Sequence, residues 1–178
     1  MDCFNGCTKL NRVDVSSVQQ IGNAGFKNCY KLVSIDLPVC TKIDANAFES
    51  SGIITINAPL VETVGDAVFK WCNSLESIKL PALKILGSGL FEGCGKLKLA
   101  DFDSVNTING YSWSGPFAQC KNLETLILRS NSVVSTSSDM SGLLSSTKIK
   151  SGGTGYIYVP SALIEDYKVA TNWATVAS

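Results

Sequence analysis

Five of the seven cysteines follow a phenylalanine at the same distance. Each lies three residues after it, with a leucine three residues further on, as in FNGCTKL, FKNCYKL, FKWCNSL, FEGCGKL and FAQCKNL. A sixth copy, FESSGI at Phe48, has serine in place of the cysteine. Thiols can act as nucleophiles, bind metals or form disulfides. They can equally be architectural, because a free cysteine behaves as a small buried hydrophobe with a weak donor.

The phenylalanines mark an internal repeat, with spacings of 22, 22, 21, 22 and 26 residues between Phe4, Phe26, Phe48, Phe69, Phe91 and Phe117. This period is typical of a solenoid. Each copy continues with a short alternating segment, VDV, IDL, INA, IKL, ADF or LIL, which predicts a strand with two side chains inward and one outward. One coil cannot bury its apolar anchors alone, so we expect the stacking of neighbours to dominate the stability.

Stacking changes the interpretation of the cysteines, because equivalent residues of adjacent coils lie about 4.8 Å apart and point in parallel. A column of parallel thiols does not converge on one metal ion. Histidine is absent, which removes the Cys-His and Ser-His dyads and the histidine zinc sites. We therefore predict no catalytic residue, no metal site and no cofactor, and we leave occasional disulfide pairing under oxidation open. The column comprises Cys7, Cys29, Cys72, Cys94 and Cys120 and is interrupted at Ser51.

Composition excludes several classes of partner. Fifteen basic and fifteen acidic side chains cancel, so no strong field attracts nucleic acid or an anionic membrane surface. No apolar run approaches the 18 or so residues that span a bilayer. The amino terminus, MDCFNGCTKL, has no charged start and no continuous apolar stretch of a signal peptide. We predict no nucleic-acid binding, no direct membrane insertion and no export signal in this chain.

The repeats resemble the BspA-type leucine-rich repeat, whose pattern I-G-x-x-A-F-x-x-C-x-x-L-x-x-I-x-L-P is followed closely by IDANAF and FKNCYKLVSIDLP. The resemblance spans six copies, from Cys3 to about Val134. It implies an α/β repeat, a right-handed leucine-rich-repeat solenoid of about six 22-residue coils with short parallel strands. It also implies a place on the cell surface or in secreted proteins, often in adhesins that bind host matrix proteins or other cells. The fifth copy departs from the pattern, with Ala100 for the aliphatic anchor and Asp103 for proline.

The segment GYIYVPSALIEDYKVATNW, residues 155–173, resembles the terminal segment of many such arrays. It predicts a last strand around Ile157 and Val159, Ser161 as a helix N-cap, and a capping helix over the last coil. Apolar residues fall at helical spacing along it, namely Leu163, Ile164, Tyr167, Ala170 and Trp173.

We expect three parts: the repeats over 1–134, a degenerate coil or loop over 135–155, and the C-terminal cap over 156–178. At its other end the chain starts part-way through a coil, at the phenylalanine. That start predicts a truncated chain, whose upstream part could hold an export signal and further repeats.

The outward positions of the main strands are our candidate partner-binding face, because solenoids bind extended partners on a regular sheet. A solvated face without a ligand is equally compatible with these residues. Three strand aspartates without the loop spacing of a calcium site do not predict calcium binding. The face comprises Asp14, Asp36, Asn57, Lys79, Asp101 and Ile127, with Arg12, Ser34, Thr55, Ser77, Leu99 and Thr125 beside them.

An insertion in the fifth copy, INGYSWSGPF, places Tyr111 and Trp113 on an expected loop. Loop aromatics can stack on sugars or anchor a protein partner. They can also fold back onto their own coil, and we favour that interpretation.

Three functions therefore compete: a surface binding or adhesion module for a protein or glycan partner, a structural spacer with no ligand, and an enzyme. We disfavour the enzyme because no nucleophile, base or metal cluster is evident.

Overall fold

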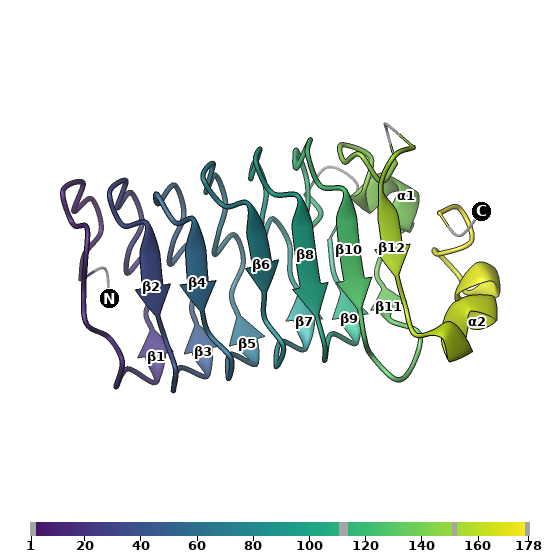
Figure 1. Cartoon of the computed structure of the whole chain (residues 1–178), viewed down its shortest axis with the longest axis horizontal. Helices are drawn as coiled ribbons and strands as arrows, with labels where there is room; N and C mark the ends of the chain where they lie inside the picture. Colours follow the sequence, from purple (N-terminus) through teal and green to yellow (C-terminus); the bar gives the residue numbers. More distant parts are fainter. Residues whose placement is uncertain (1–2, 111–113, 151–152, 177–178) are drawn as a thin grey trace.

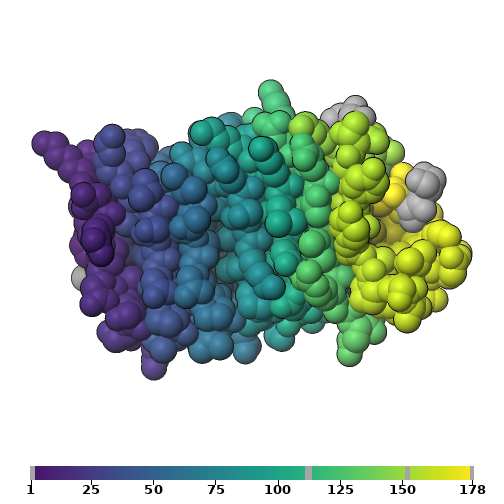
Figure 2. Space-filling model, in the orientation of Figure 1, coloured from purple at the N-terminus to yellow at the C-terminus, as the bar shows by residue number. Residues whose placement is uncertain are grey.

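Each repeat of the sequence forms one coil of a parallel-strand solenoid, and the coils lie side by side along the molecule (Figure 1). This computed structural model describes residues 3–110, 114–150 and 153–176. The predicted solenoid with short parallel strands is confirmed. In Figure 2 the coils follow one another from the N-terminal to the C-terminal end, so every coil contributes to the same face.

A coil contains a main strand and a shorter second strand. Each set forms two parallel sheets of strands from neighbouring coils, β2-β4 and β6-β8-β10-β12 for the main strands, β1-β3-β5 and β7-β9-β11 for the second strands. The main strands are β2 (Ser34–Asp36), β4 (Thr55–Asn57), β6 (Ser77–Lys79), β8 (Leu99–Phe102), β10 (Thr125–Leu128) and β12 (Tyr156–Tyr158). The second strands are β1 (Gln20–Ile21), β3 (Lys42–Ile43), β5 (Thr63–Val64), β7 (Ile85–Leu86), β9 (Thr107–Ile108) and β11 (Ser135–Thr136). The second set was not expected from the sequence, because two residues are too short to show alternation.

The first copy differs from the expectation, because its VDV segment, residues 13–15, is not a strand in the described chain. Instead the Asp14 carboxylate accepts hydrogen bonds from the Ser16 N–H and hydroxyl, at 3.0 and 2.8 Å, in a local turn. A coil at the end of an array has a neighbour on one side only, so less pairing holds its backbone extended.

The phenylalanines form a continuous spine through the core. Rings of successive coils stack nearly parallel, with centroids 5.1 to 5.6 Å apart, from Phe4 through to Phe117. All of them are buried except Phe4, which is partly exposed in the first coil. From Leu32 onward the anchor is fully buried in every copy; it lies six residues after the phenylalanine, except in the third copy, where Ile53 lies five residues after Phe48.

Around each phenylalanine the backbone makes a turn arc, which we define as the residues from two before the ring to two after it. The residue two after the phenylalanine has positive φ in every coil: Gly6, Asn28, Ser50, Trp71, Gly93 and Gln119. In this arc alternate N–H groups point to the next coil, while the N–H groups between them bond within their own coil, as Lys27 N does to Ala24 O at 3.1 Å. Accordingly Phe26 N donates to Ala47 O at 2.7 Å and Phe48 N to Val68 O at 2.9 Å, each in the next coil.

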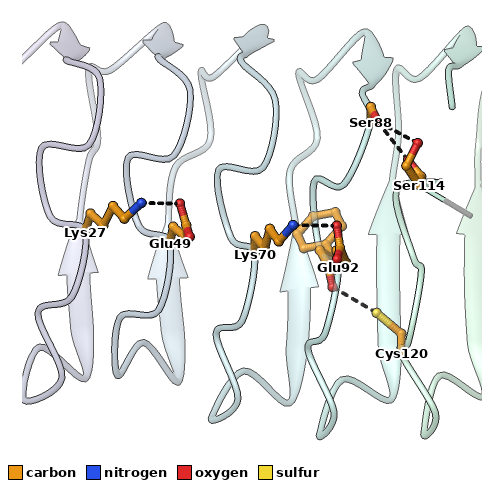
Figure 3. A network of polar contacts seen from close by, with 8 residues as sticks. Lys27, Glu49, Lys70, Ser88, Glu92, Ser114 and Cys120 are labelled. Atoms are coloured by element: carbon orange, nitrogen blue, oxygen red, sulfur yellow. Dashed lines mark hydrogen bonds and ion pairs between the residues drawn. The ribbon is translucent and has the colours of Figure 1, made fainter.

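Side chains reinforce the turn arc on its outer surface (Figure 3). Lys27 pairs with Glu49 at 2.8 Å and Lys70 with Glu92 at 2.9 Å, each across one coil interface. Just before the arc, the Ser88 hydroxyl donates to the Ser114 carbonyl at 2.8 Å. The charged pairs are partly exposed, so each contributes only about 0–1 kcal/mol.

Residues 135–155 contain a short helix that the sequence did not predict, α1 (Met140–Leu143). The Asp139 carboxylate caps it by accepting from Ser141 N at 2.8 Å. Met140, Leu143 and Leu144 are buried against the coils, so this part of the segment closes the core.

The C-terminal segment forms a 3₁₀ turn, η1 (Ser161–Leu163), followed by α2 (Ile164–Val169). The predicted N-cap was wrong, because Ser161 lies inside η1, Pro160 precedes it, and no side chain caps either element.

The predicted apolar stripe of the cap is only partly confirmed, since α2 ends at Val169 and Ile164 is exposed. Tyr167 and Trp173 make the buried contact, with their rings edge to face at 4.8 Å. The Val134 N–H donates to the Tyr167 hydroxyl at 3.0 Å, and Trp173 Nε1 donates to the Val134 carbonyl at 2.7 Å. Within the described ranges, no helix is both long and apolar enough to cross a bilayer.

Candidate partner-binding face and the cysteine column

The parallel register gathers the outward side chains of the main strands into two columns. Asp36 faces Asn57, and Ser34 faces Thr55, across β2 and β4. Lys79, Asp101 and Ile127 align across β6, β8 and β10, with Ser77, Leu99 and Thr125 beside them. The residues that the sequence proposed for β2 to β10 therefore share one face.

The first coil contributes less to this face than expected. A depression of about 410 Å³ brings Arg12 together with Ser34, Asp36, Thr55 and Asn57. Asp14 does not line it and is held in its own turn by Ser16.

Several polar side chains of the face bond to one another. Asn57 donates to Asp36 at 2.7 Å, and the Arg129 guanidinium bonds both Asp101 and Asp103, the latter at 2.9 Å. The hydrogen bond to Asp101 is the main reason that the pKa of Arg129 is raised. Lys79 approaches Asp101 to 3.7 Å from the other side. Asp101 is consequently buried, which corrects its expected exposure.

Two residues that we did not propose continue the columns. Tyr156 pairs in register with Thr125, and Tyr158 with Ile127. Their side chains are 64% and 54% exposed, among the most exposed large hydrophobic side chains of the described residues. The signal was present in the sequence, because IYV of the last strand has the phase of IDL and so turns both tyrosines outward.

The candidate loop aromatics Tyr111 and Trp113 lie outside the described residues.

The cysteine column makes one repeated hydrogen bond. From Cys29 onward, each thiol donates to the carbonyl of the phenylalanine in the preceding coil, as Cys120 does in Figure 3. The distances are 3.1 Å for Cys29 to Phe4, 3.0 Å for Cys72 to Phe48, 3.1 Å for Cys94 to Phe69 and 3.0 Å for Cys120 to Phe91. Ser51 occupies the cysteine position in the third copy, with its hydroxyl 3.4 Å from the Cys72 thiol.

Burial keeps these thiols protonated. Desolvation raises the pKa of Cys72 from its ordinary value of 9.0 to about 11 and that of Cys120 to about 12. The same effect raises the pKa of Cys29 and of Cys94. A nucleophile or metal ligand must be a thiolate, so these four buried thiols are unsuited to either role at neutral pH. In the part of the chain that the structure describes, no three histidine, cysteine or acidic side chains could together hold a metal ion.

Sequence comparison agrees with this geometry. The model of the BspA type leucine rich repeat region matches six copies, over residues 1–124 and 41–153. The chain belongs to the BspA-type leucine-rich repeat family.

Two solved structures are similar to this BspA-type array. One is a leucine rich cell surface protein from Faecalibacterium prausnitzii A2-165, 14% identical over 72% of this chain and 56% of that one, with a TM-score of 0.39. The other is a leucine-rich repeat protein from Bacteroides ovatus ATCC 8483, 26% identical over 79% of this chain and 49% of that one, with a TM-score of 0.42. The chain thus spans about half the length of each. No curated protein matches it significantly.

The burial of the cysteines in this BspA-type array predicts two classes of thiol, one that reacts rapidly and one that reacts slowly. Cys3 and Cys7 are exposed, and the other five cysteines are buried. We expect a colorimetric disulfide reagent to modify two thiols rapidly in the native protein and all seven after denaturation, because buried protonated thiols react slowly. Rapid modification of more than two native thiols would contradict the packing described for the column.

A loss of stability at alkaline pH should follow from the same burial. The pKa of Cys72 is higher in the folded BspA-type array than in the unfolded chain, so its contribution is complete below about pH 9 and is lost as the pH rises towards about 11. Urea unfolding at about pH 7 and about pH 10.5 should show wild type losing more stability than Cys72→Ser, whose hydroxyl does not titrate there. Parallel losses in both proteins would show that the buried thiol does not contribute.

Proposed function

We propose that this chain is a non-catalytic binding or adhesion module, at the cell surface or secreted, that contacts a protein or glycan partner through its exposed repeat sheet. Host matrix or cell-surface proteins are the partner class that the family suggests. The observation that carries the proposal is the unbroken register from β6 to β12, which aligns outward side chains in two columns. A regular exposed sheet of this kind is the surface on which solenoids bind extended partners.

A structural spacer is the second candidate, and a specific observation favours it. Asp36 bonds Asn57, and Arg129 bonds Asp101 and Asp103, so part of the face satisfies its own hydrogen-bonding groups. A surface that needs no partner would look the same in this region. An enzymatic function is not proposed, because burial raises the pKa of the repeated thiols and disfavours thiolates.

Two variants distinguish the binding module from the spacer, because each introduces negative charges on only one face of the array. The face variant carries Ser34→Glu, Ser77→Glu and Thr125→Glu on the main strands. The control carries Gln19→Glu, Thr63→Glu and Ser135→Glu on or beside the second strands, in coils of the same array. Gln20 is left unchanged because its amide donates to the Asp44 carboxylate at 2.8 Å. Both variants add three charges at outward positions, so their effects on solubility and net charge are matched.

Wild type, face variant and control are tested on immobilised matrix proteins and on a glycan array. We expect saturable binding by wild type and control and its loss in the face variant, because buried uncompensated carboxylates oppose association. Silence from all three well-folded proteins would favour the spacer. Equal binding by the two variants would move the site away from the main strands.

A further inference from the structure

Two hollows meet at the C-terminal end of the exposed face. The first, about 450 Å³, is lined by Ile127, Leu128, Arg129, Tyr158, Val159 and Pro160. The second, about 550 Å³, lies between β12 and the C-terminal cap, and Tyr158 and Val159 line it as well. Both volumes lie in the range of ligand sites in proteins. A ligand that fills both hollows must cross Tyr158, which favours an extended occupant over a compact one.

The charges around the hollows are already compensated within the chain. Arg129 lines the first hollow and bonds Asp101 and Asp103. Lys168 lines the second and pairs with Glu165 at 2.7 Å. The walls are otherwise mostly apolar, with Ile157 and Trp173 in the second hollow. Among the described residues that line the two hollows, a charged partner would find no free counter-charge, so the surface suits an uncharged occupant.

The two tyrosines distinguish a peptide from a sugar. The rings of Tyr156 and Tyr158 are 6.2 Å apart and inclined at 50°, so they do not form one flat platform for a saccharide ring. Both are exposed, and their hydroxyls can donate hydrogen bonds to carbonyl groups and accept them from amide groups of an extended backbone. Tyrosine is also among the residues that most often dominate binding energy at protein interfaces.

We propose that an extended, uncharged peptide segment of a partner protein lies across Tyr158 and places one apolar side chain in each hollow. This inference rests on the proposed function and specifies its partner as a protein.

The test uses the full chain and a phage-displayed random peptide library as the probe. We expect enrichment of uncharged sequences with two apolar residues a few positions apart. Binding of a synthetic enriched peptide should weaken about tenfold or more in Tyr158→Ala. It should be unchanged in Tyr30→Ala, a matched control because Tyr30 is 55% exposed, against 54% for Tyr158, and lies in another coil outside both hollows.

The proposal is overturned if no sequence is enriched, if the enriched sequences are charged, or if Tyr158→Ala binds the peptide as well as wild type does. Glycan binding that depends on Tyr158 would also overturn it. A partner that is lost in the three-glutamate face variant but retained in Tyr158→Ala would leave the proposed function standing and remove only this inference.

Discussion

Replacing Phe69 by alanine should lower the free energy of unfolding by about 3–5 kcal/mol, the usual cost of removing a buried aromatic ring. Phe69 is fully buried and stacks on two rings, Phe48 at 5.6 Å and Phe91 at 5.5 Å. Phe4 is partly exposed and stacks on Phe26 alone. Phe4→Ala should therefore cost only about 1–2 kcal/mol, because less apolar area is buried there.

Urea unfolding of the two variants, followed by circular dichroism, measures this difference. Because neighbouring coils supply the contacts, an internal loss affects two interfaces and a terminal loss affects one. Equal shifts in midpoint for Phe4→Ala and Phe69→Ala would refute the dominance of stacking. A changed slope in Phe69→Ala alone would indicate that the array no longer unfolds in one step.

A second large effect is expected from a single methyl group at Gly65. A Cβ there would lie 2.4 Å from Ala45 N and 2.7 Å from Ala45 Cα, both backbone atoms of the preceding coil. Neither atom can move without displacing a coil, so Gly65→Ala should cost at least about 1–3 kcal/mol, as overpacked cores do.

Gly87 is the matched control, because it holds the same place in the next repeat, LGSG against VGDA. A Cβ at Gly87 meets only the Asp66 side chain, at 3.3 Å, and this side chain can move aside. Thermal unfolding should show a clear loss for Gly65→Ala and little change for Gly87→Ala. Similar melting temperatures for the two variants would mean that the coils are not packed as closely as described.

Most of the fold could be predicted because the same pattern of apolar residues recurs in each copy of the repeat. The alternation of IDL or IKL was enough to turn Ile35 and Ile78 inward, and both are buried. The second strands could not be predicted, since a two-residue strand such as Lys42–Ile43 shows one apolar residue and no period. The left-handed position after each phenylalanine is indicated where it is Gly6 or Asn28, but nothing about Trp71 predicts its φ of 59°.

The sequence predicted which side chains of the candidate face align across the strands, but it did not predict the hydrogen bonds and ion pairs among them. The alternation of inward and outward residues in each repeat predicts that Lys79 lies beside Asp101, and the strand register pairs these two residues. The burial of Asp101 depends on Arg129, which lies 28 residues later and reaches back across one coil. Such a contact depends on side-chain length and on the direction of stacking, which a linear pattern does not contain. Tyr156 was missed for a different reason, since we assigned its segment wholly to the cap.

The turn arc gives the whole array a polarity. In every coil from the first to the fifth phenylalanine, the ring residue's N–H donates forward, from Phe4 to Gly25 and finally from Phe91 to Pro116. The carbonyl just before each later ring consequently faces the N-terminal end, and the N–H of each ring residue faces the C-terminal end, as at the two termini of a helix. If two copies of the array were placed head to tail, the free N–H groups of one would meet the free carbonyl groups of the other. If they were placed head to head, carbonyl groups would meet carbonyl groups. Two such arrays could therefore continue one another only with the same chain direction.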